Sequence, residues 1–123
     1  MLTAIKSIKE DLEKATSYPV YYRRNVEEQP SYPYITFSYY TQQLQDYADD
    51  FFIQIYVYDK DISPQRIEKI SGDIRRFYTS DSYSLKNSGL LMRFQSLTVD
   101  SSPILETLEH QERSLLLITR IYY

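Results

Sequence analysis

Several residue types are scarce in this chain of 123 residues, and each scarcity removes a class of function. There is no cysteine, so thiol nucleophiles, disulfides and thiolate metal sites are excluded. The two glycines, Gly72 and Gly89, stand alone, so no glycine-rich loop can cradle a phosphate. The single histidine, His110, has Glu109 and Glu112 nearby but no nucleophile motif, and we interpret it as a surface residue. The sequence therefore predicts a protein that is not an enzyme and uses no cofactor.

Long apolar runs are also missing. The longest, Leu115 to Ile118, is far shorter than the roughly 20 residues of a membrane-spanning helix. Met1 to Lys14 is charged and amphipathic, unlike the apolar core of a signal peptide. We therefore expect no membrane partner.

The formal net charge of −3 argues against binding to duplex DNA or RNA, which usually requires a basic surface.

The acidic residues form two clusters, Asp46, Asp49 and Asp50, then Asp59 and Asp61. Neither cluster has the ligand spacing, the glycine and the terminal glutamate of a calcium-binding loop. We interpret them as solvated charge or as protection of a strand edge, and predict no metal site. A carboxylate pair for glycoside hydrolysis could arise by chance among 17 acidic residues, so that signal has no specificity.

Tyrosine is the abundant residue, with 14 copies and no tryptophan. Its ring favours strands, and its apolar body with a polar tip favours interfaces. The excess therefore indicates either a β-rich core or a contact surface.

Two amphipathic helices are predicted. In the first, apolar residues recur at spacings of three and four, and the helix should end before Tyr18-Pro19. The residues of its apolar face are Leu2, Ile5, Ile8, Leu12 and Ala15. The second should begin with Ser63 as N-cap and Pro64 in the first turn, with Ile62 and Ile67 as a hydrophobic staple. Its expected buried stripe is Ile67, Ile70, Ile74 and Phe77.

Composition and alternation predict strands at residues 20–22, 34–40, 51–58, 90–99 and 113–123. In the third, Phe51, Ile53, Ile55 and Val57 form an aliphatic, core-like face. The last has apolar residues on both faces, which is typical of a central strand. Residues 41–50 either continue the second strand or form a hairpin loop. Residues 23–33, 79–89 and 100–111 are expected to be connections, with a turn of helix at 104–108.

We therefore expect a single α+β domain over residues 1–123, with the order helix, three strands, helix, two strands. Two helices on one face of a mainly antiparallel or mixed sheet of about five strands is the economical architecture. The pattern leaves open whether the strand after the second helix is parallel or antiparallel to its neighbours.

One sheet face with Tyr40, Tyr56 and Tyr58 has two interpretations. The rings could stack single-stranded nucleic-acid bases, or they could pack under helices or between subunits. The acidic balance favours packing. The candidate interface residues are Tyr40, Leu44, Tyr47, Asp49, Asp50, Tyr56, Tyr58, Tyr83 and Arg113.

The order and texture of the segments resemble those of bacteriophage tail terminator and related neck proteins. The resemblance is carried by the opening helix LTAIKSIKEDLEKA, by SYPYITFSYY followed by FFIQIYVYDKD and SPQRIEKI, and by the chain end HQERSLLLITRIYY. It extends over nearly the whole chain as an order of elements.

This resemblance implies a homo-hexameric ring that caps the tail tube and contacts a head-completion or connector protein. DNA would be passing cargo only, and the protein would be found in the virion neck and, during assembly, in the host cytoplasm. A different neck component is one alternative. A tyrosine-based module that binds single-stranded nucleic acid is another.

Overall fold

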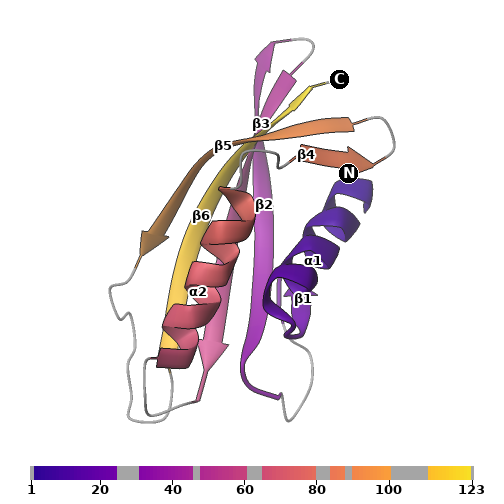
Figure 1. Cartoon of the computed structure of the whole chain (residues 1–123). Coiled ribbons are helices and arrows are strands. Elements are labelled where there is room, and N and C mark those ends of the chain that lie inside the picture. The colour runs from indigo at the N-terminus through magenta and orange to yellow at the C-terminus, as the bar shows by residue number, and fades with distance from the viewer. Residues whose placement is uncertain are drawn as a thin grey trace.

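The computed structural model describes residues 2–24, 31–45, 48–60, 65–79, 84–87, 90–100 and 111–122 (Figure 1). Its elements are α1 (Leu2–Thr16), β1 (Val20–Tyr22), β2 (Tyr34–Gln45), β3 (Ala48–Asp59), α2 (Gln65–Tyr78), β4 (Ser84–Asn87), β5 (Leu90–Asp100) and β6 (Gln111–Tyr122). The strands form one sheet in the order β1-β2-β3-β6-β5-β4. β1 is parallel to β2, and every other pair is antiparallel.

Both helices lie on the same face of this mixed sheet (Figure 1). The predicted α+β class and element order are confirmed. The strand predicted at residues 90–99, β5, is antiparallel to both of its neighbours, which answers the question that the sequence left open. Among the described residues, no helix combines the length and apolarity that crossing a membrane requires.

β3 and β6 occupy the middle of the sheet, and the central position of β6 was predicted from its apolar residues on both faces. The core face of β3 comprises Phe51, Ile53, Ile55 and Val57, and all four are fully buried. Leu115 and Leu117 of β6 continue this layer at 0% exposure. Burying these side chains beneath the helices supplies the main driving force for folding, because each removes a large apolar area from water.

α1 ends where its sequence predicts, before Tyr18-Pro19. The Thr16 hydroxyl donates to the Leu12 carbonyl (2.7 Å), and the Tyr18 N–H donates to the same hydroxyl (3.3 Å). Ser17 has a φ of 65°, the left-handed conformation in which many helices terminate. These contacts satisfy backbone groups at the helix end and turn the chain into β1.

α2 packs Ile67, Ile70 and Ile74 against the sheet, as predicted. The buried surface also includes Ser71 and Tyr78, whereas Phe77 is only partly buried at its edge. The predicted N-cap Ser63, together with Pro64 and Ile62, lies outside the described residues, as does the predicted turn at 104–108.

Two of the expected connections contain strand. β2 continues to Gln45 and β3 begins at Ala48, so the strand continuation is the correct alternative for residues 41–50. Residues 84–87, expected to be loop, form β4 on the edge of β5, which makes six strands rather than about five. The segment was missed because it has only four residues, SLKN, three of them polar, and its pairing with β5 decides its conformation.

Ile53 lies in the centre of the core, between Tyr39 of β2 and Leu117 of β6. We expect Ile53→Ala to lower the free energy of unfolding by about 3 kcal/mol, because it removes buried methylene groups and leaves a cavity. Urea denaturation measures this loss. Gln43→Ala, on an exposed position of the same sheet, is the control and should change stability by less than about 0.5 kcal/mol. Equal losses in both variants would contradict this description of the core.

Candidate interaction surface

The other face of the sheet has no described helix over it, and we call it the open face. Alternate residues of each strand point to it, because side chains alternate along a strand. The register places Tyr34 beside Tyr58, Thr36 beside Tyr56 and Tyr40 beside Phe52. β6 adds Leu116 and Ile118, paired with Gln54 and Phe52. The open face is therefore made mainly of aromatic rings, hydroxyls and aliphatic side chains.

Five tyrosines form a connected group, the tyrosine cluster, at the end of the sheet where β2 begins and β3 ends. Tyr34 is its centre and stacks on Tyr58 with ring centroids 4.9 Å apart. Tyr34 also contacts Tyr32 at 5.2 Å and Tyr21 at 6.1 Å. Tyr58 continues to Tyr56 at 6.3 Å. Aromatic pairs in such geometries stabilise beyond the area that they bury.

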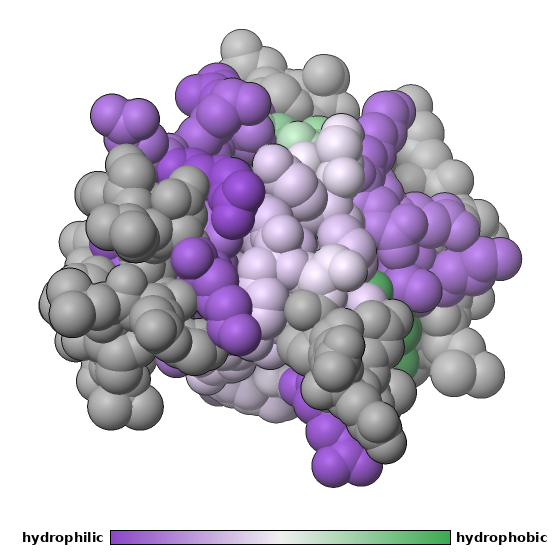
Figure 2. Space-filling model, turned by 90° about the horizontal axis from the view of Figure 1, so that it is seen from below, coloured by the Kyte–Doolittle hydropathy of each residue, from purple (hydrophilic) through white to green (hydrophobic). Residues whose placement is uncertain are grey.

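Figure 2 views the molecule from this end of the sheet. A pale, weakly polar area occupies the middle, and strongly hydrophilic residues flank it on both sides. A less polar centre with a polar margin is the usual pattern of a protein contact surface.

Burial raises the pKa of Tyr34 to about 12, with contributions from the neighbouring phenols of Tyr32 and Tyr58 and from Glu112. Burial also raises the pKa of Tyr58, against a lowering by its hydrogen bond with Thr36. Both phenols therefore stay neutral at physiological pH. The tyrosine cluster presents uncharged hydroxyls, which can donate and accept hydrogen bonds at an interface.

This raised pKa predicts an alkaline loss of stability. A phenol whose pKa is higher in the folded state stabilises that state below its unfolded pKa, and the contribution disappears as pH rises through the folded value. We expect stability to fall between pH 10 and about 12. Tyr34→Phe should lose less stability over that interval, as measured by urea denaturation at several pH values. An alkaline loss of the same size in Tyr34→Phe and the natural sequence would contradict this role for Tyr34.

The opposite end of the open face has a second aromatic contact. Tyr40 stacks on Phe52 with centroids 4.7 Å apart and ring planes only 2° from parallel. Tyr40 is 58% exposed, so much of its side chain is open to solvent. Beside it, Arg120 Nε lies 2.9 Å from Asp50 Oδ1 across the strands. This ion pair offsets the charges of Asp50 and Arg120.

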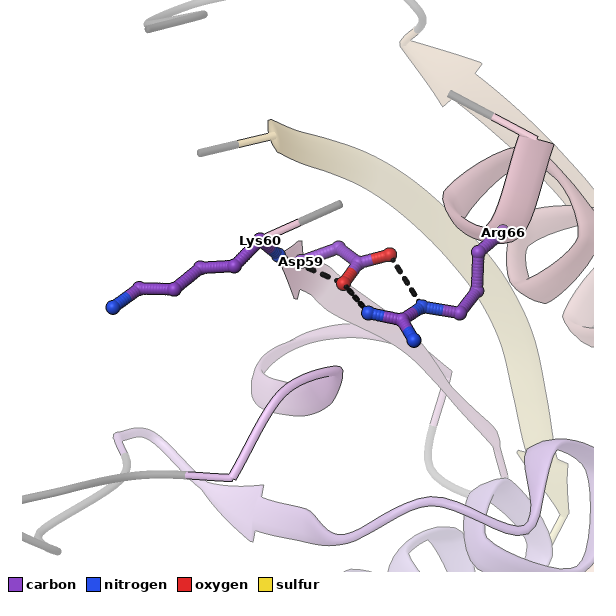
Figure 3. Close-up of polar contacts among 3 residues, drawn as sticks. All are labelled: Asp59, Lys60 and Arg66. Atoms are coloured by element: carbon purple, nitrogen blue, oxygen red, sulfur yellow. Dashed lines mark hydrogen bonds and ion pairs between the residues drawn. The ribbon is translucent and has the colours of Figure 1, made fainter. Parts of the chain in front are cut away.

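On the helix side, a buried carboxylate joins β3 to α2 near the tyrosine cluster (Figure 3). Asp59 is fully buried and accepts a hydrogen bond from the Lys60 N–H (2.7 Å). Its other oxygen accepts from Arg66 Nε at 2.9 Å, in a two-point contact with the guanidinium. The Lys60 side chain points away from Asp59, and its ammonium lies 4.8 Å from the Tyr32 ring centroid. Asp59 thus binds the start of α2 through Arg66, and the adjacent Lys60 contacts Tyr32 at the margin of the tyrosine cluster.

Replacing Arg66 should lower stability, because it leaves the buried carboxylate of Asp59 without its ionic partner. We expect Arg66→Met to lower the free energy of unfolding by about 2 kcal/mol, since the variant removes charge-assisted hydrogen bonds to Asp59. Arg75→Met, at an exposed position of the same helix, is the matched control and should be nearly neutral. Thermal unfolding of the two variants makes the comparison. If Arg66→Met proved as stable as Arg75→Met, the anchor would have no energetic importance.

The structure brings some of the predicted interface residues together and separates others. Tyr40, Tyr56, Tyr58 and Asp50 share the open face. Asp49 is half-buried and alternates to the other side of β3. The side chain of Leu44 lies outside the described part of β2, and Tyr47 and Tyr83 lie outside the described residues.

Arg113 lies on the helix side, where its side chain is 8% exposed and its Nε lies 2.8 Å from Glu68 of α2. It therefore points into this chain rather than out towards a partner.

Sequence reasoning missed the centre of the tyrosine cluster, Tyr34, and the stacking partner Phe52. Strand alternation could have identified both. Tyr34 is an even number of residues from Tyr40 and so lies on the same face of β2, and Phe52 lies on the same face of β3 as Tyr56 and Tyr58.

No group of three or more potential metal ligands occurs in the part of the chain that the structure describes. The single histidine, His110, lies outside that part.

Comparison with known proteins gives a fold but no family. No protein-family model matches the sequence, and no curated protein matches it significantly. One solved protein, whose name states no function, has a TM-score of 0.74 at 10% identity, over 99% of this chain and 92% of its own. A chain from the virion of a native gene transfer agent particle has a TM-score of 0.64 at 12% identity, over 99% and 93%. At these identities the likeness establishes the fold alone.

Proposed function

We propose that this protein is a non-enzymatic structural subunit of a phage or phage-like particle, and specifically a tail terminator that forms a ring on the end of the tail tube. The observation that carries the proposal is the likeness to a chain of a gene transfer agent virion, which spans nearly the whole of both chains. The segment order that resembles tail terminators points the same way.

The surface chemistry supports a role in assembly. The described side chains of the open face are mostly uncharged, because its phenols are neutral and Asp50 is paired with Arg120, which leaves Glu112 as a charged group on it. Such a surface loses little hydration energy when another protein covers it, whereas unpaired charges would resist burial. A head-to-tail contact between copies closes into a ring when its rotation divides a full turn. In this proposal the ring is hexameric and contacts the tail tube and a head-completion or connector protein.

A different neck component is the alternative that shares this support, since the same likeness to a virion chain favours it. The nucleic-acid alternative has less support. Tyr56 and Tyr58 are half-buried and stack on each other, so their faces are partly occupied. Bases bind to free aromatic faces. Tyr40 offers an exposed ring, but the carboxylate of Glu112 on the same face disfavours phosphate.

Electron microscopy of particles made without this gene tests the proposal. A tail terminator predicts overlong tails, because nothing stops the polymerisation of the tube. Tails of normal length, separate from filled heads, would instead indicate a joining protein. Restoring the gene in trans should restore normal particles and is the control. Intact, infectious or gene-transferring particles without the protein would contradict any role in the neck.

A further inference from the structure

Among the described residues, only the beginning of the outer edge of β2 has a neighbouring strand. β1 covers only Ile35 to Phe37, because it consists of three residues. Arg23 then takes a φ of 71°, a left-handed conformation that is unfavourable for a residue with a side chain. The Arg24 N–H donates to the Tyr22 carbonyl (2.9 Å), so the chain turns at this point. Within the described residues, no strand pairs with the outer edge of Ser38–Gln45.

The covered part of β2 shows which backbone groups point outward. The Ile35 N–H donates to the Pro19 carbonyl (3.0 Å), and the Phe37 carbonyl accepts from the Arg23 N–H (2.7 Å). In an extended strand the N–H and C=O of one residue point to the same side, and the side alternates with each residue. The groups of Tyr39, Thr41 and Gln43 therefore point outward, since the pairing with β3 stays regular as far as Gln43.

This edge lacks the features that normally prevent a second strand from pairing. Natural edge strands are short, charged, bulged or interrupted by proline. The residues from Ser38 to Gln45 read SYYTQQLQ and contain no charge, proline or glycine, and the irregularity in pairing comes only after Gln43. Strands with open, uncharged edges of this kind accept another strand by backbone hydrogen bonding.

The far side of the sheet offers a complementary edge. β4 pairs with β5 only from Leu90 to Arg93, and no other described strand covers the rest of β5. The pairing of β5 with β6 is irregular between Phe94 and Ser96, and the regular segment that follows, from Ser96 to Val99, is uncharged. Three successive antiparallel pairings separate β2 from β5, so the two strands run in opposite directions. A copy placed beside β2 with its sheet in line would thus present β5 antiparallel to it.

We propose that copies of this chain assemble head to tail by pairing the open edge of β2 in one copy with the open edge of β5 in the next. The inference rests on the proposed function, and it names the contact that would form the ring. The resulting sheet would continue from subunit to subunit, and its face would be the open face with the tyrosine cluster. Pairing of β2 with β2 would instead produce a two-fold dimer. In that dimer the β2 edges of both copies are already paired with each other, so the contact cannot extend into a ring.

Thr41→Pro tests the contact. Proline removes the outward N–H of Thr41 and is tolerated on an edge strand where that N–H faces solvent. We expect the variant to fold, with a melting temperature lowered by no more than about 5 °C. It should lose the ring, whether measured by native mass spectrometry of the free protein or on purified tail tubes. Thr41→Val keeps the N–H and a similar shape, and should assemble like the natural sequence.

Engineered cysteines locate the neighbouring strand, and the natural chain has none to interfere. Ser38 and Thr98 point to the open face at the same level of the sheet, through Gln54 and Leu116. In a ring whose axis runs along these strands, rotation from one copy to the next keeps that level, so Ser38 of one copy should lie close to Thr98 of the next. A mixture of Ser38→Cys and Thr98→Cys proteins should form a disulfide-linked pair on oxidation, with Ser96→Cys as the neighbouring position two residues along β5.

The outcomes separate the two proposals. Rings that form normally from Thr41→Pro, or assembled protein without any Ser38–Thr98 or Ser38–Ser96 link, would overturn the edge contact and leave the tail terminator proposal standing. A homodimer linked through Ser38→Cys alone would show two-fold β2 pairing and would also overturn it. Failure of the natural sequence to assemble, even on tail tubes, would overturn both proposals.

Discussion

The structure depends on the pairing of β3 with β6, two strands of 12 residues that remain in register from Ala48 and Tyr122 to Asp59 and Gln111. Every residue of β3 that faces the helices is fully buried from Phe51 onward. Because side chains alternate strictly along a strand, this burial also fixes what the other face displays. The aromatic open face is therefore a consequence of the same register that builds the core.

The two faces of the sheet are held by different kinds of interaction. On the helix side, α2 is anchored by Asp59 with Arg66 and by Glu68 with Arg113, in addition to its isoleucines. In each pair one partner is buried and the other is exposed, so the buried charge has an ionic partner that water also reaches. The open face is instead occupied by stacked rings and neutral phenols. This division leaves the charged groups to position the helix and the weakly polar groups available for contact.

The sequence predicted the elements whose apolar spacing is strong. Both helices, the aliphatic face of β3 and the central position of β6 follow from periodicity, because burial selects residue type at those positions. β4 and the full length of the β2–β3 hairpin did not follow, since polar residues such as Lys86 and Gln42 adopt strand only through pairing with a neighbour.

The candidate site was only partly predictable. Alternation placed Tyr40, Tyr56 and Tyr58 on one face, which the structure bears out. The centre of the tyrosine cluster required the register between strands, which pairs Tyr34 with Tyr58. Predicting the open edge of β2 would have required knowledge beyond the register. That edge depends on where β1 stops, and that is set by the left-handed turn at Arg23, which no composition signal marks.

In the proposed assembly, copies of this chain contact one another through their sheets rather than through their helices. Hydrogen exchange of the backbone amides, compared between the free chain and the assembled ring, tests it most directly. The account predicts that assembly slows exchange at Tyr39, Thr41 and Gln43, while the amides of α2 exchange as in the free chain. Protection gained along α1 or α2, with the edge of β2 exchanging as fast as before, would contradict it.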